Sequence, residues 1–177
     1  MTKDPLGEVY LTAKQIQTRV KELGEKISAA YRGKQLVLVG ILRASFVFMA
    51  DLVRCMDIPL SLDFMAISSY EGIEGAPGAV RILKDLDEPI AGKHVLIVED
   101  IIDTGLTLGY LIRHLDARNP ESINICTLLD RSVRRIVPLP ITFTGFDIPD
   151  VFVVGYGMDY RQLYRNLPSL HLCEIRA

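Results

Sequence analysis

The sequence predicts an α/β protein in which helices flank a mostly parallel sheet. Apolar runs of the length of buried strands alternate along the chain with segments of helical spacing, which is typical of a parallel sheet with crossover helices. The 177 residues are 49% hydrophobic, enough for one domain with a substantial core but too few for two domains of ordinary size. We therefore expect a single domain over residues 1–177.

The first predicted elements are a helix, a strand and a second helix. Thr12 and Gln15 fit a capping box, and apolar residues then recur at helical spacing, namely Ile16, Val20, Leu23 and Ile27. Residues 35–42 form a continuous apolar run, which predicts a strand buried on both faces. Residues 45–56 follow with helical spacing.

The alternation continues to about residue 130 and then stops. We expect further strands and one helix over residues 60–68, 81–86, 93–100, 104–117 (the helix) and 122–129. Prolines interrupt the rest of the chain, where the strand-like pieces are short, at residues 141–145, 151–155 and 171–175. We interpret residues 131–177, together with the N-terminal segment, as a small hood on the main sheet.

A glycine-rich segment separates two of the predicted strands. Between Tyr70 and Val80 the sequence reads EGIEGAPGA, in which Gly72, Gly75 and Gly78 oppose regular structure. This segment is either an idle surface loop or a mobile lid.

Composition excludes several classes of protein. Twenty Lys and Arg residues against 22 Asp and Glu give a net charge of -2, so no basic field points to nucleic acid or a membrane surface, and a small polar ligand is a better expectation. The three cysteines are irregularly spaced without a CxxC, which argues against disulfides and a structural zinc site. The N-terminus resembles no signal peptide and no apolar stretch approaches a membrane span, so we expect a cytoplasmic protein.

The stretch VEDIIDTGLT, residues 98–107, contains the polar residues most suited to binding a ligand. An apolar run ends in Glu99 and Asp100, Asp103 follows, and a helix then begins at about Thr104. A helix N-terminus attracts anions, whereas carboxylates repel them. A ribose 5-phosphate ester fits both the helix start and the carboxylates. The helix start, with Thr104, Gly105 and Thr107, would hold the phosphate. Glu99 and Asp100 would accept hydrogen bonds from ribose hydroxyls and attract Mg²⁺.

Three other interpretations of this stretch are weaker. Helix capping would account for only one of the three acids. A nucleotide hydrolase would need a G-x-x-x-x-G-K-[ST] phosphate loop, which the sequence lacks. A phosphate-receiver domain opens with such a strand, whereas here the motif lies in the second half of the chain.

VLIVEDIIDTGLTL, residues 95–108, resembles the phosphoribosyl pyrophosphate motif of type I phosphoribosyltransferases. With Leu42-Arg43-Ala44, Ser69-Tyr70 and FVVGYGMDYRQLYR (residues 152–165), the chain is similar to the 6-oxopurine branch from about residue 12 to the C-terminus. The resemblance implies the type I phosphoribosyltransferase fold, with a central mostly parallel sheet, a small hood and a mobile lid loop. It also implies Mg²⁺-dependent purine salvage, in which phosphoribosyl pyrophosphate and hypoxanthine or guanine give IMP or GMP and pyrophosphate.

The resemblance also implies roles for individual residues. Asp103 corresponds to the acid that takes the proton from N7 of the purine. Leu42, Arg43 and Ala44 form the pyrophosphate loop, where a cis peptide between the first two is expected and where the family usually has Lys-Gly after the first position. Arg165 reaches pyrophosphate, and Ser69 and Tyr70 begin the lid. The phosphoribosyl group is bound by Glu99, Asp100, Asp103, Thr104, Gly105, Leu106 and Thr107.

The same resemblance places the purine beside the hood. Phe152 stacks on the base, the backbone of Val153 reads its edge, and Arg131 stands where the family commonly has a lysine that donates to the 6-oxo group. Ile101 and Asp159 complete the purine site, and Glu99, Asp100 and Asp159 are the acids associated with magnesium.

Two alternatives stay open. One is a regulatory RNA-binding protein on the same fold, and the other is a transferase for a different base, such as orotate, uracil or adenine. The family also favours a homodimer or homotetramer.

Overall fold

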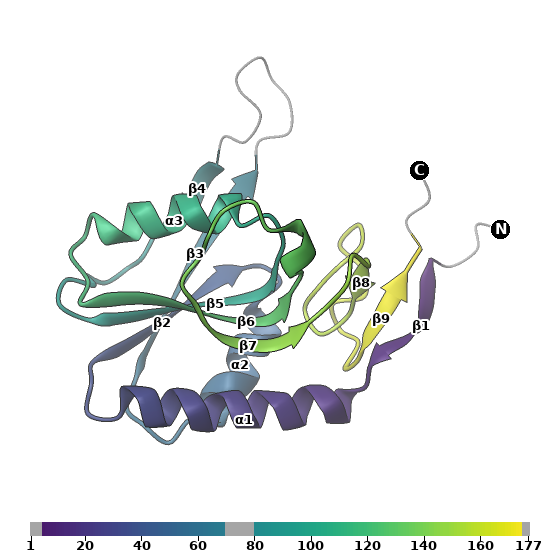
Figure 1. The fold of residues 1–177 in the computed structure, drawn as a ribbon, viewed down its shortest axis with the longest axis horizontal. Helices are drawn as coiled ribbons and strands as arrows, with labels where there is room; N and C mark the ends of the chain where they lie inside the picture. Colours follow the sequence, from purple (N-terminus) through teal and green to yellow (C-terminus); the bar gives the residue numbers. More distant parts are fainter. Residues whose placement is uncertain (1–4, 70–79, 175–177) are drawn as a thin grey trace, which may run out of the picture.

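The centre of the molecule is a six-stranded sheet with the order β4-β3-β2-β5-β6-β7 (Figure 1). The structure is a computed structural model that describes residues 5–69 and 80–174. All neighbouring strands are parallel except β4, which runs antiparallel to β3 at one edge. The strands are β2 (Leu36–Leu42), β3 (Ser61–Ser69), β4 (Val80–Lys84), β5 (His94–Ile102), β6 (Ser122–Asp130) and β7 (Ile141–Asp147).

Helices cover both faces of this sheet. The helices α1 (Ala13–Tyr31) and α2 (Phe46–Arg54) lie on one face, and α3 (Leu106–Asp116) lies on the other (Figure 1). Side chains alternate between the two faces along a strand, so Leu38 packs with α1 and α2 while Val39 packs with α3. The continuous apolar run of β2 therefore forms part of two cores, as the sequence predicted.

The start of α1 follows the predicted capping box. The Gln15 backbone N–H donates to the Thr12 hydroxyl over 3.3 Å, and the Thr12 N–H donates to Gln15 Oε1 over 2.9 Å. The apolar stripe from Ile16 to Ile27 is buried, which confirms the predicted helix.

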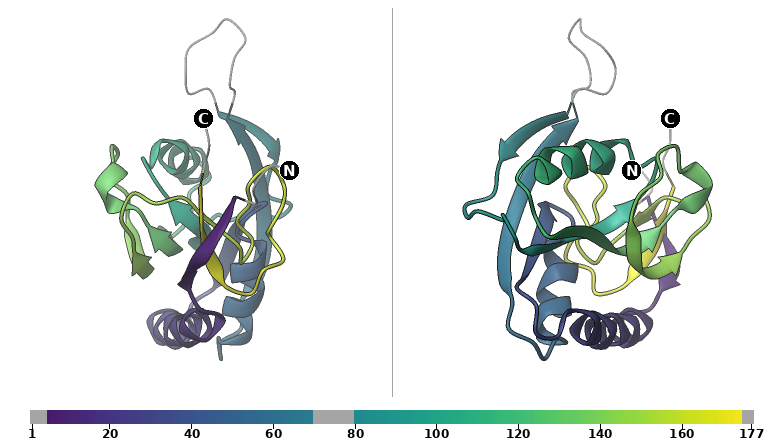
Figure 2. Two further views of the ribbon diagram at one scale, coloured as in Figure 1. Left: turned by 90° about the vertical axis from the view of Figure 1, so that its right-hand side faces the viewer. Right: turned by 60° about the vertical axis from the view of Figure 1, so that its left-hand side comes forward.

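The hood is a three-stranded antiparallel sheet with the order β1-β9-β8. It joins β1 (Leu6–Leu11) from the N-terminal segment to β8 (Val153–Val154) and β9 (Leu170–Cys173), and Figure 2 shows it from two further directions. The predicted hood therefore exists. The strand expected at residues 151–155 is shorter in the structure, where it forms β8. The strand expected at residues 171–175 is also shorter, and as β9 it begins one residue earlier.

One assignment within the hood was wrong. We expected residues 141–145 to belong to it, but β7 pairs in parallel with β6 and extends the main sheet. Contacts with α1 hold β7 in this position. Arg19 of α1 donates from Nε to the Gly145 carbonyl over 2.7 Å and from Nη2 to the Thr144 carbonyl over 2.9 Å. A short strand pattern alone does not reveal which sheet it joins.

Two predicted boundaries shift at the acidic motif. Strand β5 continues to Ile102, because Ile101 and Ile102 still pair with β6, so Glu99 and Asp100 lie inside the strand. Helix α3 begins only at Leu106, with Gly105 as its N-cap at φ 81°. The glycine-rich segment 70–79 lies outside the described residues. None of the helices formed by residues 5–69 and 80–174 has the length and apolar character needed to cross a bilayer.

Candidate active site

Three loops meet where parallel strands of the main sheet end. Strands β2, β5 and β6 are neighbours, so the segments that follow them emerge at the same edge. The Arg131 backbone N–H donates to the Ile102 carbonyl over 2.9 Å, which brings the ends of β6 and β5 together. Residues that the sequence predicted for one site therefore lie near each other at this edge, although they come from separate parts of the chain.

Glu99 and Asp100 form a buried acidic pair in β5. Their exposed fractions are 9% and 8%. Burial and then the neighbouring Asp100 charge raise the pKa of Glu99 well above its ordinary value. Burial raises the pKa of Asp100 to about 6, against the opposing effects of hydrogen bonds and of the Arg165 charge. Two desolvated carboxyls side by side favour the approach of a cation.

The start of α3 borders a cavity of about 220 Å³. Thr104 accepts a hydrogen bond from the Leu106 N–H over 3.4 Å. Gly105 is closely surrounded, because a Cβ there would stand 3.1 Å from the Val137 carbonyl oxygen. The Leu106 side chain is exposed and does not line the cavity. Its lining is Glu99, Ile101, Ile102, Asp103, Thr104, Gly105, Thr107 and Leu108.

Asp103 and Arg131 form an ion pair at this cavity. Arg131 Nη1 lies 2.8 Å from Asp103 Oδ1, although the two atoms are not aligned as in a hydrogen bond. Arg131 is 5% exposed, and its Nη2 donates to the Val151 carbonyl, next to Phe152. The residue predicted to read the purine therefore touches the residue predicted to take its proton.

The predicted base-stacking residue has an accessible ring. Phe152 is 36% exposed and meets Tyr160 edge to face, with ring centroids 6.1 Å apart. Val153 is buried in β8, where it pairs with Leu172 of β9, so its side chain is not exposed to a ligand.

The predicted pyrophosphate loop contacts the hood. The peptide between Leu42 and Arg43 is cis, as expected. Arg165 Nη2 lies 2.6 Å from Asp159 Oδ1, and both Arg43 and Arg165 contact Gln162. The structure thus brings the loop and the 159–165 segment together. Of the two lid residues, Ser69 ends β3 and Tyr70 lies outside the described residues.

Sequence reasoning missed several residues at this site. Arg135 Nε donates to the Asp103 carbonyl over 2.8 Å and its Nη2 pairs with Asp130, which supports the loop after β5. Asp150 binds Arg134 Nε at 2.7 Å and lies 4.0 Å from Arg131 Nε. The basic run RSVRR after a strand end was a signal for the arginines. Nothing in the sequence pattern distinguished Gln162.

Among the residues described, no three His, Cys, Asp or Glu side chains converge as a ready-made metal centre. Mg²⁺ commonly takes only one or two protein carboxylates, with water and substrate phosphates completing its shell. The buried pair in β5 fits that pattern.

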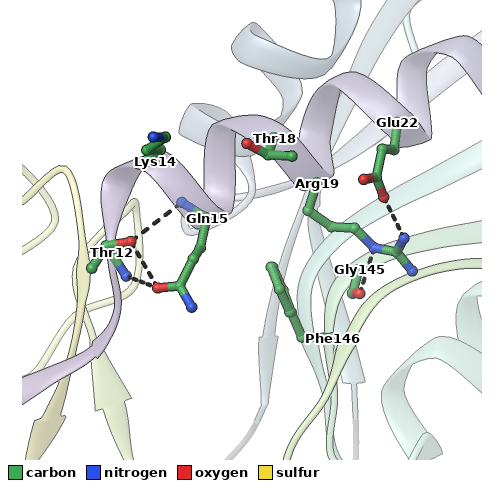
Figure 3. Close-up of a pocket in the computed structure, with 8 residues that line it drawn as sticks. All are labelled: Thr12, Lys14, Gln15, Thr18, Arg19, Glu22, Gly145 and Phe146. Atoms are coloured by element: carbon green, nitrogen blue, oxygen red, sulfur yellow. Dashed lines mark hydrogen bonds and ion pairs between the residues drawn. The ribbon is translucent and has the colours of Figure 1, made fainter.

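A larger groove, of about 460 Å³, lies between the start of α1 and the end of β7 (Figure 3). Four of its polar side chains are already paired, Thr12 with Gln15 in the capping box and Arg19 with Glu22 at 2.7 Å. It contains no residue of the acidic motif. We therefore place the candidate active site at the smaller cavity.

The fold and site are those of an α/β protein suited to an anionic ligand at the carboxyl edge of a parallel sheet. Residues 8–161 match the family described as "Phosphoribosyl transferase domain". The hypoxanthine phosphoribosyltransferase of Salmonella typhimurium is 53% identical over 163 residues, which cover 91% of this chain and 92% of that protein. The hypoxanthine-guanine phosphoribosyltransferase of Mycobacterium avium is 48% identical, covering 97% and 88%.

A solved structure agrees with these sequence matches. The crystal structure of a hypoxanthine phosphoribosyltransferase from Staphylococcus aureus superposes with a TM-score of 0.91 at 48% identity, covering 96% of this chain and 92% of that one. The chain belongs to the phosphoribosyltransferase family, and its type I fold is as predicted.

Proposed function

We propose that this protein is a purine salvage transferase. It moves the 5-phosphoribosyl group from phosphoribosyl pyrophosphate to N9 of hypoxanthine or guanine, giving IMP or GMP and pyrophosphate. The observation that carries the proposal is the contact of Asp103 with Arg131 beside the acidic strand and the start of α3. The names of the relatives at about 50% identity support the same activity.

The sugar phosphate binds along the 220 Å³ cavity. Backbone N–H groups at the start of α3, with the hydroxyls of Thr104 and Thr107, hold the 5'-phosphate. Glu99 and Asp100 accept hydrogen bonds from the ribose hydroxyls. Arg43 and Arg165 face the pyrophosphate group.

Glu99, Asp100 and Asp159 are the residues that would hold Mg²⁺ with the substrate. When bound, the ion neutralises charge on the departing pyrophosphate. The protein's own contribution is to position the two substrates and to bury Glu99 and Asp100, which attract the cation.

The purine is read along one edge. O6 and N7 of a 6-oxopurine are neighbouring atoms on that edge. Arg131 donates to O6, and Asp103 accepts the N7 proton as the N9 bond forms, which requires the two side chains to lie as close as they do here. Phe152 stacks on the face of the base, and Ile101 lies on the cavity side.

A panel of free bases with phosphoribosyl pyrophosphate and Mg²⁺ tests this proposal. We expect product from hypoxanthine and guanine. Adenine should react about 10⁴-fold less efficiently, because its amine would leave the buried Arg131 donor without an acceptor. Comparable turnover of adenine, orotate or uracil would overturn the base assignment. RNA retained on a filter by a protein that turns over no base would instead favour the regulatory alternative.

A cytoplasmic location and a homodimeric or homotetrameric assembly are further proposals, which rest on the family resemblance.

A further inference from the structure

The side chain of Gln162 lies between two arginines from distant parts of the chain. Its Oε1 accepts a hydrogen bond from Arg43 Nη1 over 3.0 Å and another from Arg165 Nη2 over 3.2 Å. The backbone N–H of Gln162 donates to Asp159 Oδ2 over 2.8 Å. Both ends of this residue are therefore engaged by groups of the site.

The charges around Gln162 do not balance. Arg165 pairs with Asp159 at 2.6 Å, whereas Arg43 contacts the neutral amide. Two guanidinium groups repel each other, and an amide oxygen can accept from both without cancelling either charge. The cluster of Arg43, Asp159, Gln162 and Arg165 therefore carries one net positive charge, which suits an anion.

The backbone holds the two arginines near each other by a second link. A Cβ on Gly157 would stand 2.2 Å from the Ala44 carbonyl oxygen, so the hood lies directly against the loop after β2. Arg165 Nη1 also donates to the Gly157 carbonyl over 2.8 Å. Arg161, Gln162 and Tyr164 all have positive φ, a conformation that persists where surrounding contacts fix it.

We propose that Gln162 is a positioning residue that holds the Arg43 and Arg165 guanidinium groups side by side for the pyrophosphate group of the substrate and product. This inference rests on the proposed function and adds a residue to it. The neutrality of the side chain is essential, because a carboxylate with the same reach would keep the hydrogen bonds and cancel the net positive charge.

A merely structural role predicts different behaviour. Gln162 is exposed, and exposed hydrogen bonds contribute little to folding, so its variants should fold. A purely structural residue would then leave ligand affinities unchanged or alter those of both substrates together. A positioning residue for pyrophosphate alters only the affinities for ligands that carry that group.

The test compares Gln162→Glu, Gln162→Met and the control Gln35→Glu in the full chain with Mg²⁺. Gln35 is exposed just before β2, at the opposite end of that strand from the loop, so its variant adds the same charge elsewhere. Titration calorimetry gives the dissociation constants of inorganic pyrophosphate and phosphoribosyl pyrophosphate. Steady-state assays at saturating phosphoribosyl pyrophosphate give kcat and the KM for hypoxanthine.

We expect Gln162→Glu to weaken both pyrophosphate ligands by about tenfold, because a negative charge then faces the two guanidinium groups. Gln162→Met should weaken them about threefold through loss of the shared acceptor. The KM for hypoxanthine should not change in either variant, and Gln35→Glu should match the wild type throughout.

Wild-type affinity for both ligands in Gln162→Glu would overturn the inference, as would an equal loss in Gln35→Glu. A wild-type protein that binds neither pyrophosphate nor phosphoribosyl pyrophosphate would overturn the proposed function itself, so the two failures are distinguishable.

Discussion

We propose that single residues of the acidic motif have different roles. Glu99 and Asp100 are buried within β5, whereas Asp103 follows the strand and its carboxyl is partly exposed beside Arg131. These different surroundings suit the proposed roles, in which the buried pair attracts the cation and the ribose and the partly exposed acid takes a proton.

Asp103→Asn separates those tasks. The amide keeps the shape of the side chain but cannot take the N7 proton, so kcat should fall by about 10² to 10⁴. The affinity for phosphoribosyl pyrophosphate should change little, because Glu99, Asp100 and the start of α3 are untouched. Single-turnover kinetics and direct titration measure the two quantities. Normal turnover at saturation with lost substrate binding would contradict this division.

Asp100 makes the metal-free protein sensitive to pH. Its pKa rises from the usual 3.8 to about 6 in the folded protein, so the folded state binds this proton more tightly than the unfolded state. Its contribution is therefore fully present below pH 3.8 and is lost as the pH rises through about 6. Asp100→Asn should stabilise the metal-free protein at pH 7 by about 1 to 3 kcal/mol, and this gain should disappear near pH 4.

Thermal melting in a chelator from pH 4 to 8 measures that difference between variant and wild type. A difference in melting temperature that does not vary with pH would exclude a raised pKa at Asp100 as its source.

Among the elements, the contact between the hood and the loop after β2 matters most for the site. Gly157 of the hood has φ 98° and lies against the Ala44 carbonyl of this loop, so that a Cβ on Gly157 would stand 2.2 Å from the carbonyl oxygen. Only glycine combines this backbone conformation with so short an approach.

Gly157→Ala and Gly33→Ala form a matched pair for testing this contact. Gly33 also has a positive φ, of 77°, but a Cβ there meets nothing within 4 Å. Both changes should cost about 1 to 2 kcal/mol of stability from the left-handed backbone. Only Gly157→Ala must also displace the Ala44 carbonyl, so it alone should weaken phosphoribosyl pyrophosphate binding, by about tenfold or more. Denaturant unfolding and titration calorimetry measure the two effects, and equal affinities would show that the contact is unimportant for binding.

At the scale of the whole molecule, the candidate site joins the main sheet to the hood. Glu99, Asp103 and Arg43 come from the main sheet and its loops, while Phe152 and Arg165 come from the hood side. A ligand that contacts both parts should stabilise the folded protein by mass action.

Phosphoribosyl pyrophosphate with Mg²⁺ should therefore raise the melting temperature. At about 100 times the dissociation constant the stabilisation is about 2.7 kcal/mol, which for a chain of this size corresponds to roughly 5 to 10 °C. A chelator should remove most of the shift, because in the proposed mechanism Glu99 and Asp100 bind the metal-bound form of the substrate. An undiminished shift in the chelator would argue against magnesium at Glu99 and Asp100.

The sequence alone determined the features that are contiguous along the chain. The capping box at Thr12, the buried run of β2 and the order of acidic strand and helix in residues 98–107 each involve neighbouring residues, whose spacing reflects local conformation and burial. The acidic motif, with the stretches 42–44, 69–70 and 152–165, also carried the family resemblance, and with it the predicted fold and most residues of the candidate site.

Tertiary structure decided the partners that are distant in sequence. Periodicity shows that residues 141–147 form a strand but not that α1 and β6 hold it in the main sheet. In the same way, the pairing of Arg131 with Asp103 and the position of Gln162 between two arginines arise from loops that meet only after the sheet forms. The physical reason is that backbone propensity and side-chain spacing act over a few residues, whereas contacts between separate loops depend on how the strands are ordered in the sheet.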